Sequence, residues 1–401
     1  MKFIENRKPG KQTADYRVLI KTVIGCFRFC PQISKIKRMK KFFIAIIGVL
    51  ALISLALLIV ILANENDKSV IEKYVKNENL PTIKTDWKGT PVDEKGRFVN
   101  HEFPFLPKVK DLLRWQLSGN PQKEEKQNDA TRLAVLDPTG FLESEKEGIL
   151  WLGHASFFIR LNGKSILLDP VFGKPPLVKT FVDASSPLEK IKQVDYVLLS
   201  HDHRDHADEE SIRQIAQKFP DAKFYGGLRM EELLEGWITA TNEAQTAAWF
   251  QQFILPDEKL RIYFLPVRHW CRRGLFDTNE RLWGGFVVQG AEKTIYFSGD
   301  SGYGSHYKEA AELFPEIDYF LIGIGAYKPR WFMEPNHNSP ADAMQAFIDA
   351  KAKNLIPMHF GRFDLSDEPP GEPLRMLRER AQEINLSDKI KVLNIYESLI
   401  F

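Results

Sequence analysis

The chain has 401 residues, 44% apolar and 12% aromatic, which is enough to bury a large core and excludes intrinsic disorder. Its formal net charge of +2 conceals an asymmetry. Residues 1–41 hold twelve of the 55 Lys and Arg but only two of the 53 Asp and Glu, so residues 42–401 carry a net charge of −8. A domain of that sign has no overall attraction for phosphate backbones, so we expect no nucleic-acid partner.

The first predicted element is an apolar run at residues 42–63, 22 residues without a charge. As a helix it would span about 33 Å, roughly one hydrocarbon core. We interpret it as a single uncleaved transmembrane helix that anchors the protein to the membrane. The basic segment 1–41 would then be cytoplasmic and the C-terminal domain extracytoplasmic. Translation from Met39 would give the same run the pattern of a secretory signal, so both start sites remain open.

The next segment, residues 64–147, is predicted to be a stalk and an N-terminal arm. Residues 64–100 are polar and rich in turn formers. We expect a short amphipathic helix at residues 108–117 and a charged loop at residues 119–129.

The pattern changes at Gly148, where a domain over residues 148–401 is predicted to begin. Two apolar runs flank Asn162-Gly163, the strongest short-range signal for a β-hairpin. Further apolar strands follow, first in succession and then alternating with helices. This order predicts an α/β sandwich of two mixed sheets covered by helices, with the chemistry in loops at strand ends.

Metal-capable side chains crowd at the ends of these strands. The stretch "HDHRDH" follows the apolar run "VDYVLLS", and three later apolar runs each close on a His or an Asp. Imidazole and carboxylate suit zinc, manganese or iron. Together they are enough for two metals that share a carboxylate. The candidate ligands are His201, His203, Asp205, His206, His269, Asp300 and His359.

This ordered signature resembles that of the metallo-β-lactamase superfamily over about residues 148–400. The resemblance implies a four-layer αββα sandwich with a dinuclear metal site, and two Zn²⁺ are expected, with iron or manganese as alternatives. By position, His201, His203 and His269 would hold one metal. Asp205, His206 and His359 would hold the other, and Asp300 would bridge the two.

Within the superfamily, the chain is most similar to the N-acylphosphatidylethanolamine-hydrolysing phospholipases D and their bacterial relatives. The likeness rests on "WLGHASFFI", "LLDPVF", "AYKPRWFMEPNHNSPADAM" and "PMHFGRF". Arg362 departs from it, because a threonine-like residue is expected there. The resemblance implies that a metal-bridged hydroxide cleaves a phospholipid, releasing N-acylethanolamine and leaving phosphatidic acid.

The same resemblance suggests roles for residues beyond the seven ligands. His337 would serve the leaving alkoxide, and with Asp300 and Asp205 it completes the predicted catalytic set. His154 and Asp169 would orient the ligands. The predicted substrate contacts are Asn336, Arg330 and Trp331. Each of these residues also has a plain structural interpretation, as a loop or core side chain.

The leading hypothesis is therefore a membrane-anchored, dinuclear-metal phosphodiesterase of the phospholipase D type. One alternative keeps the metals but acts on a lactone or a β-lactam, since sugar-lactone hydrolases share the "GHAS"-like entry motif. The other is a binding module that has lost catalysis. The substrate would be a phospholipid or another ester, and the oligomeric state stays open.

Overall fold

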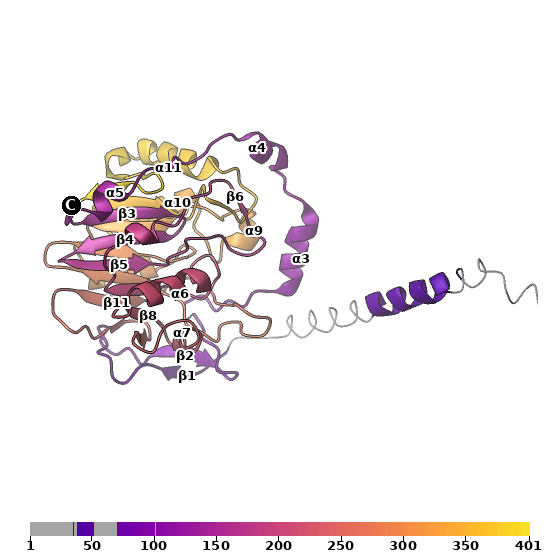
Figure 1. Ribbon diagram of the computed structural model, residues 1–401, viewed down its shortest axis with the longest axis horizontal. Coiled ribbons are helices and arrows are strands. Elements are labelled where there is room, and N and C mark those ends of the chain that lie inside the picture. The colour runs from indigo at the N-terminus through magenta and orange to yellow at the C-terminus, as the bar shows by residue number, and fades with distance from the viewer. Residues whose placement is uncertain (1–34, 36–37, 52–69, 101) are drawn as a thin grey trace, which may run out of the picture. The chain divides into compact units, whose positions relative to one another are not determined.

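The computed structural model describes residue 35 and residues 38–51, 70–100 and 102–401, in two separate units, 1–66 and 67–401 (Figure 1). Residues 38–51 are helical. The predicted transmembrane helix is described only as far as residue 51, and the remainder, like most of the basic segment 1–41, lies outside the described residues. Within the described part of the chain, no helix combines the length and the apolarity that a bilayer span requires.

Two mixed β-sheets form the centre of the second unit. The seven-stranded sheet has the order β17-β3-β4-β5-β7-β8-β9, and the six-stranded sheet runs β10 to β15 in sequence order. The strands of the first are β3 (Gly148–Gly153), β4 (Ser156–Leu161), β5 (Lys164–Leu168), β7 (Tyr196–Leu199), β8 (Lys223–Gly227), β9 (Glu243–Ala247) and β17 (Ser398–Ile400). Those of the second are β10 (Gln251–Gln252), β11 (Arg261–Leu265), β12 (Gly285–Gln289), β13 (Thr294–Phe297), β14 (Tyr319–Gly323) and β15 (Asn354–Met358).

The hairpin predicted at Asn162-Gly163 is confirmed. Strands β4 and β5 pair antiparallel, with Leu161 opposite Lys164, so Asn162 and Gly163 are the two turn residues. Both have positive φ, 50° and 71°, as a type I′ turn requires.

The two sheets pack face to face. The ring of Phe157 in β4 lies 6.3 Å from that of Phe297 in β13, and Tyr225 in β8 stacks on Phe253 at 4.7 Å. Helices cover the outer faces, which explains why strands such as β4 and β7 are buried at every position rather than at alternate ones.

The main helices of the domain are crossover connections between parallel strands. Helix α6 (Glu209–Lys218) connects the parallel neighbours β7 and β8, and α8 (His306–Leu313) and α10 (Pro340–Asp349) do the same for β13, β14 and β15. Such crossovers lie on the face of a sheet. Helix α11 (Glu372–Glu383) packs on α10 (Figure 1). The short elements are α5 (Thr139–Leu142), α7 (Glu231–Leu234), α9 (Arg330–Met333), β6 (Lys179–Thr180) and β16 (Phe363–Asp364). The α/β sandwich expected from the sequence is confirmed.

The N-terminal arm differs from the predicted stalk, because it packs onto the domain. Strands β1 (Ile71–Val75) and β2 (Thr90–Asp93) pair antiparallel, and Val92 and Phe98 are fully buried in the same core as the large sheets. The amide of Asn100 donates to the carbonyl of Val267 at 2.9 Å. Scattered apolar residues in a polar segment carry little periodicity, so the sequence did not indicate this packing.

Two helices follow in the arm. Helix α3 (Val109–Ser118) matches the amphipathic helix expected at 108–117. Helix α4 (Lys123–Asn128) replaces the charged loop expected at 119–129. Acidic residues in its first turn favour the helix, and Lys126 forms an ion pair with Asp364, which fixes α4 to the domain.

If residues 70–100 are part of the domain, Phe98→Ala lowers its free energy of unfolding by about 3–5 kcal/mol, the usual cost of a large core cavity. Thermal and urea unfolding of the full chain measure this value. Leu117→Ala is the control, since Leu117 is exposed on α3 and its truncation changes stability by no more than about 0.5 kcal/mol. Equal stabilities of the two variants would show that the arm is not part of the cooperative unit.

Candidate metal centre

Strand direction brings the predicted ligands to one place. Strand β11 is antiparallel to β12, which is antiparallel to β13, and β13, β14 and β15 are parallel. Strands β11, β13 and β15 therefore end at the same edge of the sheet, and they are followed by His269, Asp300 and His359. Stretch 201–206 follows the end of β7 in the facing sheet.

Three histidines form a first group. Nε2 of His201 lies 2.9 Å from Nδ1 of His203, and Nε2 of His269 lies 3.2 Å from that same nitrogen. Nδ1 of His269 donates to the carbonyl oxygen of Asn336 at 3.1 Å, so its Nε2 is left with a lone pair facing the other two rings. Three imidazole nitrogens that converge in this way form a site for a cation.

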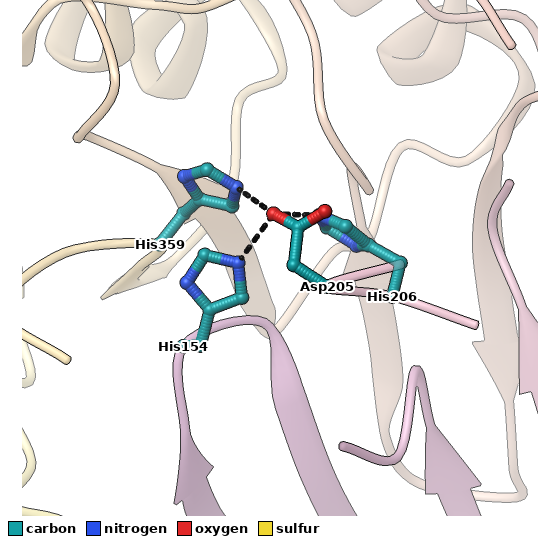
Figure 2. A group of neighbouring side chains, drawn as sticks. All are labelled: His154, Asp205, His206 and His359. Atoms are coloured by element: carbon teal, nitrogen blue, oxygen red, sulfur yellow. Dashed lines mark hydrogen bonds and ion pairs between the residues drawn. The ribbon is translucent and has the colours of Figure 1, made fainter. Parts of the chain in front are cut away.

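A second group surrounds the carboxylate of Asp205, as Figure 2 shows. Oδ2 of Asp205 lies 3.0 Å from Nε2 of His154, 3.6 Å from Nε2 of His359 and 3.7 Å from Nε2 of His206. The three rings come from three different loops and point toward one another. His154, expected to orient ligands from outside, thus stands among the groups that could contact a metal.

Asp300 lies between the two groups. Its Oδ2 is 3.1 Å from Nε2 of both His206 and His359, and 3.9 Å from Nε2 of His269. The structure therefore brings all seven predicted ligands together, with the predicted bridging carboxylate in the middle.

Asp169 orients the second group and is linked to the first. Nδ1 of His206 donates to Oδ2 of Asp169 at 2.7 Å, which leaves Nε2 of His206 facing Asp300. The main-chain N–H and the hydroxyl of Ser200 also donate to Asp169. Since that hydroxyl proton is used, Nδ1 of His201 donates to Ser200 Oγ at 2.9 Å, and Nε2 of His201 is the free nitrogen.

Backbone strain is concentrated here. His154, Asp169 and His359 all have positive φ, 56°, 38° and 61°, a region that side chains with a Cβ rarely occupy. The turn at His359 packs closely against Gly325. A Cβ at position 325 would lie 2.1 Å from the carbonyl oxygen of His359, so only glycine fits there. Such strain persists where the surrounding structure demands one geometry, as at functional sites.

Burial and charge divide the histidines into two classes. Burial and neighbouring imidazoles hold the pKa of His201 and His269 well below the ordinary value, so both are neutral ligands at pH 7. Burial alone would also lower the pKa of His359, but Asp300 and Asp205 raise it to about 9. The two carboxylates therefore attract positive charge to the middle of the site, where a metal would replace the proton.

The donor set fits two divalent cations. Oδ1 of Asp300 is buried and has no hydrogen-bond partner among the described residues, and the buried Nε2 atoms of His206 and His359 face the carboxylates of Asp300 and Asp205. Buried polar atoms are rarely left unpaired, so such a group of atoms indicates a ligand. Imidazole and carboxylate donors are those that zinc, iron and manganese accept.

Comparison with known proteins agrees with this geometry. Residues 164–360 match the family described as "Beta-lactamase superfamily domain". Over 242 residues the chain is 31% identical to "N-acyl-phosphatidylethanolamine-hydrolyzing phospholipase D 1" of Caenorhabditis elegans, covering 57% of this chain and 68% of that protein. The chain belongs to the metallo-β-lactamase superfamily. Together with the two donor groups, this membership makes it a metal-dependent hydrolase.

Two further proteins are similar to this chain over part of its length. The mitochondrial N-acyl-phosphatidylethanolamine-hydrolyzing phospholipase D of Saccharomyces cerevisiae is 30% identical over 250 residues, which are 57% of this chain and 51% of that protein. The solved structure of Igni18, a metallo hydrolase from Ignicoccus hospitalis, aligns with a TM-score of 0.49 at 20% identity, covering 64% of this chain and 98% of that one.

The structure places the predicted catalytic histidine of this metallo-hydrolase at the site. Nδ1 of His337 lies 3.8 Å from Oδ2 of Asp300, and its ring centre is 5.3 Å from that of His269. Burial lowers the pKa of His337 to about 4, so the side chain is neutral at pH 7. As a neutral imidazole it can donate a hydrogen bond to a substrate oxygen, but it offers no positive charge to a leaving alkoxide.

The three predicted substrate contacts differ from one another. Asn336 is buried beside His337, and its Oδ1 has no partner among the described residues. Trp331 is exposed on α9 under the guanidinium of Arg114. Arg330 has other partners, since it pairs with Asp342 at 2.9 Å and Glu334 at 3.6 Å and donates to the carbonyl oxygen of His337 at 3.4 Å. It is better placed to hold the His337 loop than to bind a phosphate.

Sequence reasoning missed two members of the site. Ser200 joins Asp169 to His201, and its position directly before the first ligand was the only signal for it. Trp270 directly follows the ligand His269, and its ring centre lies 4.7 Å from that of His203. An aromatic residue beside a ligand is common in any core, so it did not stand out.

Proposed function

We propose that the protein is a dinuclear-metal phosphodiesterase that hydrolyses a phospholipid such as N-acylphosphatidylethanolamine, with phospholipase D regiochemistry. The position of Asp300 between two groups of donors carries the dinuclear assignment. The choice of a phospholipid is supported by the relatives whose names state this activity.

In this proposal each group of donors holds one ion, with zinc expected at both positions. His201, His203 and His269 hold the first. Asp205, His206 and His359 hold the second, with Asp300 shared. Bound there, the two ions would activate a water molecule at neutral pH and neutralise charge on the phosphoryl oxygens.

The protein's own groups would supply the remaining chemistry. His337, neutral and beside Asp300, would donate a hydrogen bond to the departing alkoxide. Asn336, whose buried side-chain Oδ1 has no partner among the described residues, would orient the substrate beside it. Asp205 and Asp300 would stay ionised, because the surrounding histidines hold the pKa of both carboxyls well below the ordinary value despite their burial.

The substrate would be reached at a membrane. The apolar run at 42–63 would anchor the chain with its N-terminus in the cytoplasm and its hydrolase domain on the other side, raising the effective concentration of lipid at the site. The loop that carries His269 and Trp270 also carries Leu275 and Phe276, which are 85% and 87% exposed. Exposed apolar side chains next to a site are typical of an interfacial contact.

The double substitution Leu275→Ser with Phe276→Ser tests this contact. In detergent micelles that contain the lipid substrate, we expect the surface KM to rise about tenfold at unchanged kcat. Even partial burial of two large apolar side chains contributes more than about 1.4 kcal/mol. Ile254→Ser is the control, since Ile254 is exposed between β10 and β11, outside the site loops. Equal KM values for both variants would exclude a lipid contact at this loop.

The function itself is tested with the purified full chain, its metal content quantified. It is incubated with N-acylphosphatidylethanolamine in mixed micelles, and the products are identified by mass spectrometry. We expect N-acylethanolamine and phosphatidic acid in equal amounts. A parallel assay uses lactones and a chromogenic β-lactam as substrates. Hydrolysis of those substrates without hydrolysis of the lipid would refute the proposal. Bound metal without turnover of any of them would favour a binding module.

A further inference from the structure

Arg362 is a buried cation that the proposed mechanism does not use. It lies three residues after His359, between β15 and β16, and is 2% exposed. Among the described residues, no carboxylate lies within ion-pair distance of its guanidinium. A buried charge is costly unless hydrogen bonds compensate it, so the partners of the guanidinium decide its role.

The guanidinium binds main-chain carbonyl groups from two other turns. Its Nη1 donates to the carbonyl oxygens of Leu152 at 3.4 Å and Val171 at 3.0 Å, and its Nη2 donates to that of Gly173 at 3.2 Å. The guanidinium therefore links the turn that contains Arg362 to the turn before His154 and to the turn after Asp169.

These are the three turns whose site residues have a strained backbone. They also contact one another, since the N–H of His359 donates to the carbonyl oxygen of His154 at 3.0 Å and the two rings are 4.0 Å apart. The packing around the Arg362 side chain is tight. A Cβ on Gly153, which has a φ of +94°, would lie 3.0 Å from Cδ of Arg362.

All three turns serve the second group of donors. His154 contacts Asp205, Asp169 holds His206, and His359 belongs to the group itself. We propose that Arg362 is a positioning residue that fixes these turns and thereby builds the second metal position. This inference rests on the ligand assignment made above. The first group stands on the loops after β7 and β11, to which Arg362 makes no hydrogen bond among the described residues, and Asp169 reaches His201 of that group through Ser200.

The chemistry of arginine explains the departure from the threonine-like residue expected here. A guanidinium offers five N–H donors in one rigid plane and can serve several carbonyls at once. A lysine has a single nitrogen on a flexible stem, and a threonine cannot reach across to Gly173. We therefore expect the second metal position of Arg362→Lys to bind more tightly than that of Arg362→Met, but more weakly than that of the wild type.

The test is a titration of the metal-free full chain with Zn²⁺ by isothermal calorimetry, without substrate. We expect two ions in the wild type. In Arg362→Met we expect one ion with unchanged affinity and a second bound about 10–100-fold more weakly, as for other residues that orient ligands. Arg160→Met is a matched control. Arg160 is also buried and donates to the carbonyls of Phe141, Leu142 and Lys146, none of them in a site loop.

Double variants identify which ion is affected. In a His203→Ala background, which retains the second position, Arg362→Met should weaken the remaining ion. In a His359→Ala background, which retains the first, it should have no effect. The proposal is overturned if Arg362→Met binds both ions like the wild type, if Arg160→Met weakens the same ion equally, or if the wild type does not bind two ions. Because no lipid is present, failure of the phospholipase assay would leave these results unaffected.

Discussion

Asp300→Asn is expected to reduce hydrolysis at least about a thousandfold and to leave no more than one tightly bound metal. Oδ2 of Asp300 lies 3.1 Å from Nε2 of both His206 and His359 in the second group, and 3.9 Å from Nε2 of His269 in the first. An amide keeps the size of the side chain but removes the negative charge that two cations would share.

Metal content by inductively coupled plasma mass spectrometry and turnover of the lipid are measured on the same preparation. Asp221→Asn, at an exposed position, controls for the loss of one carboxylate and should match the wild type in both. Full turnover by Asp300→Asn with two bound metals would refute the assignment of Asp300 as the shared ligand.

His337→Gln is expected to lower kcat about 10²–10⁴-fold with both metals retained. Nδ1 of His337 lies 3.8 Å from Asp300 Oδ2, beyond hydrogen-bond distance, so the side chain is beside the donors without being committed to one of them. Because burial lowers its pKa to about 4, the contribution we expect is that of a neutral hydrogen-bond donor to the leaving oxygen.

The identity of the leaving group tests this role. An alkoxide leaving group needs a proton, whereas p-nitrophenolate departs without one. We therefore expect the defect of His337→Gln to shrink to less than about tenfold on a p-nitrophenyl phosphodiester. The same loss on both substrates, or a loss of metal, would assign His337 to ligand positioning instead.

Much of the site follows from local patterns. The ligands of stretch 201–206 are adjacent in sequence, and His269, Asp300 and His359 each close a short apolar run, so strand direction alone brings them to one edge. The hairpin at Asn162-Gly163 and the helix boundaries depend on turn chemistry and hydrophobic period, which are local as well. The membrane span at 42–63 remains a prediction of this kind.

The partners of individual side chains were decided only by the fold. Arg362 binds carbonyls that lie 189 to 210 residues before it in the chain, and Arg330 forms an ion pair with Asp342. The arm at 70–100 packs into the core although its sequence is polar. Periodicity and strand ends are properties of neighbouring residues, so the sequence alone determined the sandwich and its donors. Which hydrogen bond each donor makes depends on contacts between distant loops, and these exist only in the folded chain.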